Sequence, residues 1–253
     1  MRNPSPLLWT GAICALFSSS VNAIEIMPYP EAKPIGVSLE WYQHELDMEV
    51  LEIQANIPGI NNAMLDSMAG QLTSQNNLEL INLRLDYQAL PWLTVYGSVG
   101  KITDQAEVNF SAVLPGVSNM NVENNGTAYS LGARTNHQFG QWLTSVNVAH
   151  SRLDLDNNSE TVSVTSLVPS IGLKTDYGNI SGSLVYQAVK ASYSGTATVP
   201  LIGEIPVTVE AENKDAFQIM AGWQLPLAND YYINADIGLN GEKQFLLQLN
   251  KRF

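Results

Sequence analysis

The feature that most constrains this chain is the alternation of apolar and polar residues in its last ten positions. Four apolar residues occupy one set of alternate positions: Phe245, Leu247, Leu249 and Phe253. Polar residues fill the other set, with Leu246 as the exception: Gln248, Asn250 and Arg252. Successive side chains of a β-strand point to opposite faces, so this segment predicts a strand with one apolar and one polar face.

Composition narrows the fold class further. After residue 23, no stretch approaches the ~20 consecutive apolar residues of a membrane-spanning helix, although 45% of the 253 residues are hydrophobic and only 14% are charged. A membrane barrel alternates between lipid-facing and lumen-facing residues, and its average hydropathy is therefore near neutral. The formal net charge of −12 argues against nucleic acid as a partner, because such binding needs basic patches.

The terminal segment resembles the closing strand of Gram-negative outer-membrane β-barrels, which end in Phe preceded by apolar residues at alternate positions. Lys251 departs from that pattern, since the family often has an aromatic residue there, but its long stem can reach the membrane interface. The resemblance implies an antiparallel transmembrane β-barrel in the outer membrane. It also implies contact with outer-membrane lipid and lipopolysaccharide, and an assembly signal for the barrel-assembly machinery at Phe245, Leu247, Leu249 and Phe253. The alternative is an edge strand of a soluble sandwich.

The first 34 residues divide into two expected segments. Residues 1–23 have one basic residue, an apolar run over 7–17 and a small-residue site at Ala23, and they predict a signal peptide. Residues 24–34 are an irregular lead-in, and 35–253 form the barrel. Removing Arg2 with the signal takes the net charge from −12 to −13. Cys14, the only cysteine, lies in the signal, so the mature chain is expected to have no disulfide, no cysteine metal site and no cysteine nucleophile. No phosphate loop, metal-ligand spacing or nucleotide fingerprint appears in the sequence, so no metal and no cofactor are expected.

Period-two alternation recurs along the chain and predicts ten strands, with eight as the alternative. The expected strands are 35–42, 79–89, 93–100, 129–134, 142–149, 171–177, 180–188, 217–225, 231–240 and 244–253. Short connections near 90, 138, 178 and 226 alternate with long ones that begin near 47, 103, 152 and 191. Outer-membrane barrels place short turns on the periplasmic side and long loops outside. Aromatic residues near the short turns predict an interfacial girdle: Trp92, Trp142, Tyr177, Trp223, Tyr231 and Phe253.

Three long loops share a proline and a glycine set among aliphatic residues. Their apolar tips are Ile60, Leu114 and Leu201. Each loop follows an odd-numbered strand, so all three leave the barrel at the same rim. Two interpretations remain open: the tips pack together as a cap, or they form a vestibule for an apolar ligand or a patch for a partner.

Charged residues on the inward-facing positions are the best candidates for function. Seven are expected in the lumen: Glu40, Arg84, Asp86, Arg134, Lys174, Asp236 and Arg252. Four positive and three negative groups can pair, and pairing reduces the cost of burying them. The sequence allows either a closed, salt-bridged structural core or a narrow hydrated pore for a small-molecule solute.

Enzymatic function is the competing class, and its candidates are weak. His44, His150 and Ser151 fall near the outer rim and have the residue types of a base and a nucleophile. His150 and Ser151 are adjacent in a strand, however, and must point to opposite faces. We therefore expect a non-enzymatic barrel, with a lipid hydrolase at the rim as the alternative.

Overall fold

The computed structural model describes residues 33–55, 65, 69–110, 116–156, 162–199, 202–240 and 243–253. The expected signal peptide, most of the lead-in and the three loop tips Ile60, Leu114 and Leu201 lie outside the described residues. Within them, no helix is long and apolar enough to span a membrane.

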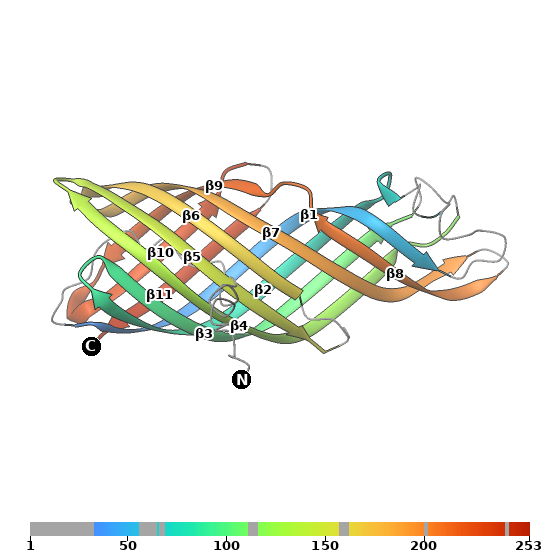
Figure 1. Ribbon diagram of the computed structural model, residues 1–253, viewed down its shortest axis with the longest axis horizontal. Helices are drawn as coiled ribbons and strands as arrows, with labels where there is room; N and C mark the ends of the chain where they lie inside the picture. Colours follow the sequence, from blue (N-terminus) through green and yellow to red (C-terminus); the bar gives the residue numbers. More distant parts are fainter. Residues whose placement is uncertain are drawn as a thin grey trace, which may run out of the picture.

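Eleven antiparallel strands make up the described chain. They are β1 (Ile35–Ala55), β2 (Thr73–Leu90), β3 (Leu93–Asn109), β4 (Met120–Phe139), β5 (Trp142–Leu155), β6 (Val162–Thr175), β7 (Gly178–Val199), β8 (Gly203–Asn213), β9 (Phe217–Pro226), β10 (Tyr231–Gly238) and β11 (Gln244–Arg252). Each strand pairs with its neighbours, and β11 pairs with β1, so the sheet closes into a barrel (Figure 1).

The eleven strands make ten passes around the barrel, as the alternation predicts. The exception is the eighth pass, which is divided into β8 and β9 by three residues, 214–216. Both halves pair with the long strand β7: β8 with Lys190–Val199, and β9 with Asn179–Tyr186. The prediction of a ten-stranded barrel is therefore confirmed. The additional strand, β8, forms a hairpin with the upper part of β7 above the barrel.

The barrel has two levels, because two hairpins are shorter than the rest. The pairing of β11 with β1 ends at His44, and above it β8 pairs with β1 from Met48 to Ala55. Elsewhere in the ring, the hairpin of β5 and β6 reaches only to Leu155 and Val162. Above it, the N–H of Ser118, just before β4, donates to the carbonyl oxygen of Thr198 in β7 at 3.1 Å. We call the ten-stranded part the lower barrel, and the six-stranded part of β1, β2, β3, β4, β7 and β8 above it the upper extension.

The outside of the lower barrel is an apolar belt. Large apolar residues face outward on every strand around the ring. Among them are Leu39, Leu83, Val99, Leu131, Val146, Ile171, Leu184, Ile219, Ile237 and Leu249, each 42–59% exposed. The six predicted girdle aromatics are also exposed and lie at or near the short-turn end. A ring of exposed apolar side chains around a polar interior is the arrangement that lipid contact requires.

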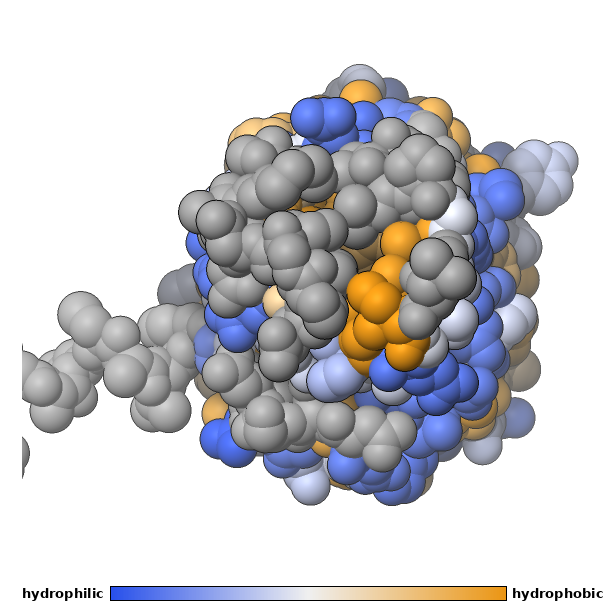
Figure 2. Space-filling model, turned by 90° about the vertical axis from the view of Figure 1, so that its right-hand side faces the viewer, coloured by the Kyte–Doolittle hydropathy of each residue, from blue (hydrophilic) through white to orange (hydrophobic). Residues whose placement is uncertain are grey.

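The upper extension reverses this arrangement, because its interior is apolar and its outside is polar. Val108, Met120 and Val209 are fully buried there. Leu65 and Ala69, two helical residues of the connection between β1 and β2, are buried in the same core. Figure 2 looks onto the loop end, where apolar side chains are visible inside a largely hydrophilic rim.

Candidate functional site

Six of the seven predicted lumen charges are buried inside the lower barrel. Glu40, Arg84, Asp86, Arg134, Asp236 and Arg252 are each no more than 2% exposed. Their positions follow from strand parity, since each alternates with outward apolar residues of the belt. Three are negative and three are positive, so the described charges of the lower interior balance.

Glu40 and Arg84 form the first ion pair. They lie on neighbouring strands, β1 and β2, and their closest N···O distance is 3.3 Å. The amides of Asn82 and Gln248 each donate to the Glu40 carboxylate at 2.9 Å. Charge pairing together with extra hydrogen bonds is what makes a buried ion tolerable.

Asp86 and Arg252 form the second pair, at the short-turn end of the barrel. The guanidinium of Arg252 donates to Asp86 and also to the carbonyl oxygen of Pro34 at 2.8 Å. Gly36 lies between them, and a Cβ at this position would be 2.3 Å from atoms of both charged groups. A side chain here would therefore force the charged groups of the ion pair to shift, and glycine leaves them room.

An aromatic residue fills the space between the charged groups. The Arg84 guanidinium lies over the Tyr96 ring, 4.1 Å from its centroid. The Tyr96 hydroxyl donates to Asn147 at 2.8 Å. Gly132 makes room for this ring, because a Cβ there would be 2.2 Å from the Tyr96 ring atoms. The lumen is thus occupied by side chains at this level.

Lys174 is the exception among the predicted lumen charges. It is exposed near the end of β6, next to the short turn that leads into β7. Its parity is inward, as expected, but the lower barrel ends at this point and no wall encloses the side chain. A lysine at the open end of a strand remains solvated, which costs far less than burial.

The three catalytic candidates are not brought together. His150 faces outward, with Nδ1 3.3 Å from the Thr165 hydroxyl, whereas Ser151 is buried and bonded to Ser130 at 2.8 Å. His44 is buried on β1: the Gln218 amide donates to its Nε2 at 2.7 Å, and its Nδ1 lies 2.7 Å from the Tyr42 hydroxyl. These histidines belong to separate hydrogen-bonded groups, and none of the hydrogen bonds described above joins either of them to the Ser151 hydroxyl.

A polar cluster inside the upper extension was not predicted from the sequence. The Asn76 amide nitrogen donates to the Asp104 carboxylate at 3.2 Å and also bonds to the Tyr193 hydroxyl, which joins β2, β3 and β7 across the interior. A cavity of about 40 Å³ lies beside these side chains and is otherwise lined mainly by apolar residues. Burial raises the pKa of the Asp104 carboxyl to about 6. Its surroundings become clear only when the strands are paired.

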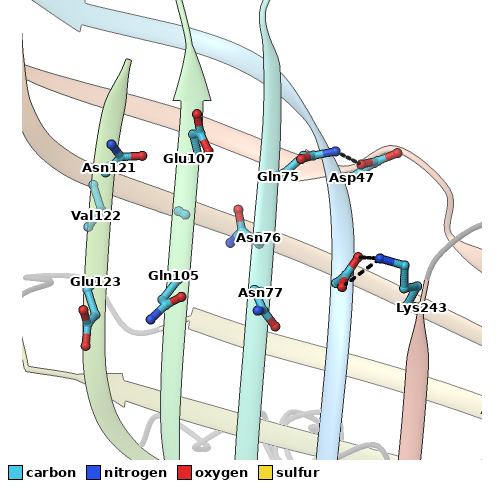
Figure 3. Close-up of a pocket in the computed structure, with 12 residues that line it drawn as sticks. Asp47, Gln75, Asn76, Asn77, Gln105, Glu107, Asn121, Val122, Glu123 and Lys243 are labelled. Atoms are coloured by element: carbon cyan, nitrogen blue, oxygen red, sulfur yellow. Dashed lines mark hydrogen bonds and ion pairs between the residues drawn. The ribbon is translucent and has the colours of Figure 1, made fainter. Parts of the chain in front are cut away.

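A second unpredicted feature is a hollow of about 730 Å³ on the outside of the upper extension (Figure 3). Two complete rungs of β1–β4 form its floor. One rung is Glu45, Asn77, Gln105 and Glu123, and the other is Asp47, Gln75, Glu107 and Asn121. All eight outward positions therefore hold an amide or a carboxylate. No group of His, Cys, Asp or Glu in the described chain has the arrangement of a metal site.

Comparison with known proteins adds distant structural likeness only. No family model and no curated protein matches the chain. The outer membrane protease OmpT from Escherichia coli matches with a TM-score of 0.45 and 9% identity over 92% of this chain and 100% of its own. The translocator domain of autotransporter NalP from Neisseria meningitidis gives 0.41 and 13% over 87% and 89%. An outer membrane channel from Pseudomonas putida F1 gives 0.40 and 13% over 92% and 100%.

The strand pairing and the apolar belt decide the class. The chain is a transmembrane β-barrel. The resemblance to outer-membrane barrels that the carboxy-terminal strand indicates is thus confirmed at the level of the fold.

Proposed function

We propose that this protein is a non-enzymatic outer-membrane barrel that is closed to solutes and has a structural role. The observation that supports this proposal is the buried charge network of the lower barrel. Glu40, Arg84, Asp86 and Arg252 are 0–2% exposed and form two ion pairs, so these charged groups of the lumen are shielded from water.

The two levels of the barrel argue against a path for solutes. A hydrated pore would expose its lining charges, and above them the chain places an apolar core that includes Val108 and Val209. The cavity in that core is about 40 Å³, whereas pockets for small molecules are typically ~300–1,000 Å³. The interior therefore favours a structural barrel over a narrow pore or a transporter of apolar ligands.

The separation of the catalytic candidates supports a non-enzymatic role. His150 and Ser151 face opposite sides of the barrel wall. His150→Ala and Ser151→Ala should therefore leave the lipid A and phospholipid profiles of expressing cells unchanged. Loss of the same lipid modification in both variants would favour the rim hydrolase.

Conductance of the refolded full chain in a planar bilayer tests the proposal directly. We expect no discrete conductance steps from the protein. The double variant Glu40→Ala with Arg84→Ala removes the first ion pair and opens space in the lumen without leaving one of its two charges unpaired. If this variant conducts, the refolded barrel inserts correctly, and the absence of steps from the unmodified chain is then due to a closed lumen. Steady single-channel steps from the unmodified chain would show that the lumen is an open pore. Fractionation of cell envelopes tests the outer-membrane location.

A further inference from the structure

The hollow over β1–β4 begins just above the apolar belt. Along β2, the outward residues pass from Ile81 in the belt to Asn77 in the hollow. Four residues of strand cover ~13 Å, and the strand tilt of membrane barrels brings the vertical rise to roughly 10 Å. The hollow is therefore at the height of the headgroups of lipids that contact the belt.

A smaller hollow lies beside this site, towards the belt. It has a volume of about 330 Å³, its lining includes Leu239 and Phe245, and it shares Glu45 and Lys243 with the larger one. Phe245 makes an edge contact with Trp41, with ring centroids 5.4 Å apart. The linings of the two adjacent hollows thus pass from apolar side chains near the belt to polar side chains above it.

The lining selects for hydroxyl groups. Amide side chains both donate and accept hydrogen bonds, and carboxylates accept them, so the two rungs match the paired donors and acceptors of sugar hydroxyls. Asn77 and Gln105 are directly opposite each other on β2 and β3, at the centre of the first rung. Both are exposed on the outer face and accessible from the hollow.

The charge of the lining disfavours anionic headgroups. Four carboxylates, on Glu45, Asp47, Glu107 and Glu123, stand against one ammonium, on Lys243, which gives a net charge of −3. That ammonium contacts both carboxylate oxygens of Glu45, at 2.9 and 3.2 Å. A phosphate placed here would be repelled by the other three carboxylates, and the ammonium of the lining is already paired with Glu45.

From these observations, we propose that the hollow binds the neutral, hydroxyl-rich sugar headgroup of a membrane lipid whose acyl chains lie on the belt below. This proposal does not depend on whether the lumen is closed, so it is separable from the structural role proposed above.

Native mass spectrometry of the full chain tests this proposal. The refolded protein is released from mixed micelles that contain equal amounts of digalactosyldiacylglycerol and phosphatidylglycerol. We expect the unmodified chain to retain the galactolipid in preference. Asn77→Val with Gln105→Val removes the central amides while keeping strand-forming residues, and it should reduce galactolipid retention roughly ten-fold.

A matched control lies on another part of the upper extension. Ser194 and Thr208 are an outward, hydrogen-bonded pair on β7 and β8, 3.2 Å apart. Ser194→Val with Thr208→Val should leave lipid retention unchanged. Glu107→Gln with Glu123→Gln should raise phosphatidylglycerol retention, because it removes two of the repelling charges. Each variant is first checked for the heat-modifiable band of a folded barrel.

Three outcomes would overturn the proposal. In the first, the unmodified chain retains both lipids equally. In the second, the double variant of Asn77 and Gln105 retains as much galactolipid as the unmodified chain does. In the third outcome, free digalactose would bind as tightly as the galactolipid, which would show that the ligand is a soluble sugar rather than a membrane lipid.

Discussion

At the residue scale, buried acids have different partners in the two levels of this protein. In the lower barrel, buried acids have buried arginines as partners, as in the pairs of Glu40 with Arg84 and Asp86 with Arg252. In the upper extension, Asp104 is 4% exposed and accepts a hydrogen bond from the neutral amide of Asn76. Burial in such surroundings favours the protonated form of an acid more than water does, and it raises the pKa.

Asp104 should therefore make the upper extension less stable as the pH rises. The pKa of its carboxyl is about 6 in the folded chain, against an ordinary value of 3.8. The folded state thus holds the proton more tightly, and stability is highest below pH ~4 and falls as the pH rises to ~6. The two pKa values differ by an amount equivalent to roughly 2–3 kcal/mol. We expect Asp104→Asn to remove this pH dependence and to increase protease resistance at pH 7.

The test needs a control, because proteolysis itself changes with pH and Asp104 shares its surroundings with other polar groups. His44 lines the same cavity, and Tyr193 is bonded to the same amide of Asn76. The measurement is therefore the difference between the unmodified chain and Asp104→Asn in proteolysis of the upper extension at pH 4, 5, 6 and 7. Asp47→Asn, an exposed acid of the same extension, is the matched control. Parallel curves for the unmodified chain and Asp104→Asn would refute the role of Asp104.

At the element scale, closure of the barrel depends on the last strand. β11 pairs with β1 from Gly36 to His44, and the N–H of Phe253 donates to the carbonyl of Ile35 at 2.8 Å. Phe253 therefore makes two contributions: a backbone bond that ends the closing ladder, and an exposed ring at the short-turn end.

Two variants separate these contributions. Deleting Phe253 removes both the bond and the ring, and we expect poor insertion and a weak heat-modifiable band. Phe253→Ala keeps the bond and removes only the ring, so its folded yield should lie between those of the deletion and the unmodified chain. If the deletion inserts normally, the terminal strand is not an assembly signal for this chain.

Strand parity explains what could be predicted for these elements. It placed Leu246 on the inward face of β11, where the residue is fully buried. The expected first connection begins near 47, but the alternation continues through Val50 and β1 runs on to Ala55. The alternation breaks only at a β-bulge between Val50 and Glu52, where the pairing with β8 shifts by one residue.

At the scale of the whole molecule, residue pattern was a good guide to the barrel and a poor guide to its sites. Ten passes, short turns and a girdle follow from period-two alternation and turn chemistry. The outer hollow does not, because Asn77, Gln105 and Glu123 come from three strands and become neighbours only through their register. The link between Asn76 and Tyr193 likewise spans 117 residues of sequence.

The upper extension and the lower barrel should unfold separately. Val108 is fully buried in the apolar core of the upper extension, whereas the lower barrel is held by its own ladder and ion pairs. Val108→Asp places an unpaired charge in that core, which costs several kcal/mol. We expect new protease cleavage in the upper extension, while the lower barrel stays protected in lipid and keeps its heat-modifiable band.

Ser194→Asp is the matched control for this last experiment. It introduces the same side chain on β7 of the upper extension, but at an exposed outward position. We expect its cleavage pattern to match that of the unmodified chain, because a solvated carboxylate carries no desolvation cost. If Val108→Asp instead abolishes the folded band entirely, the two levels fold as one cooperative unit. In that case the upper core, and not only the membrane ladder, is required to close the barrel.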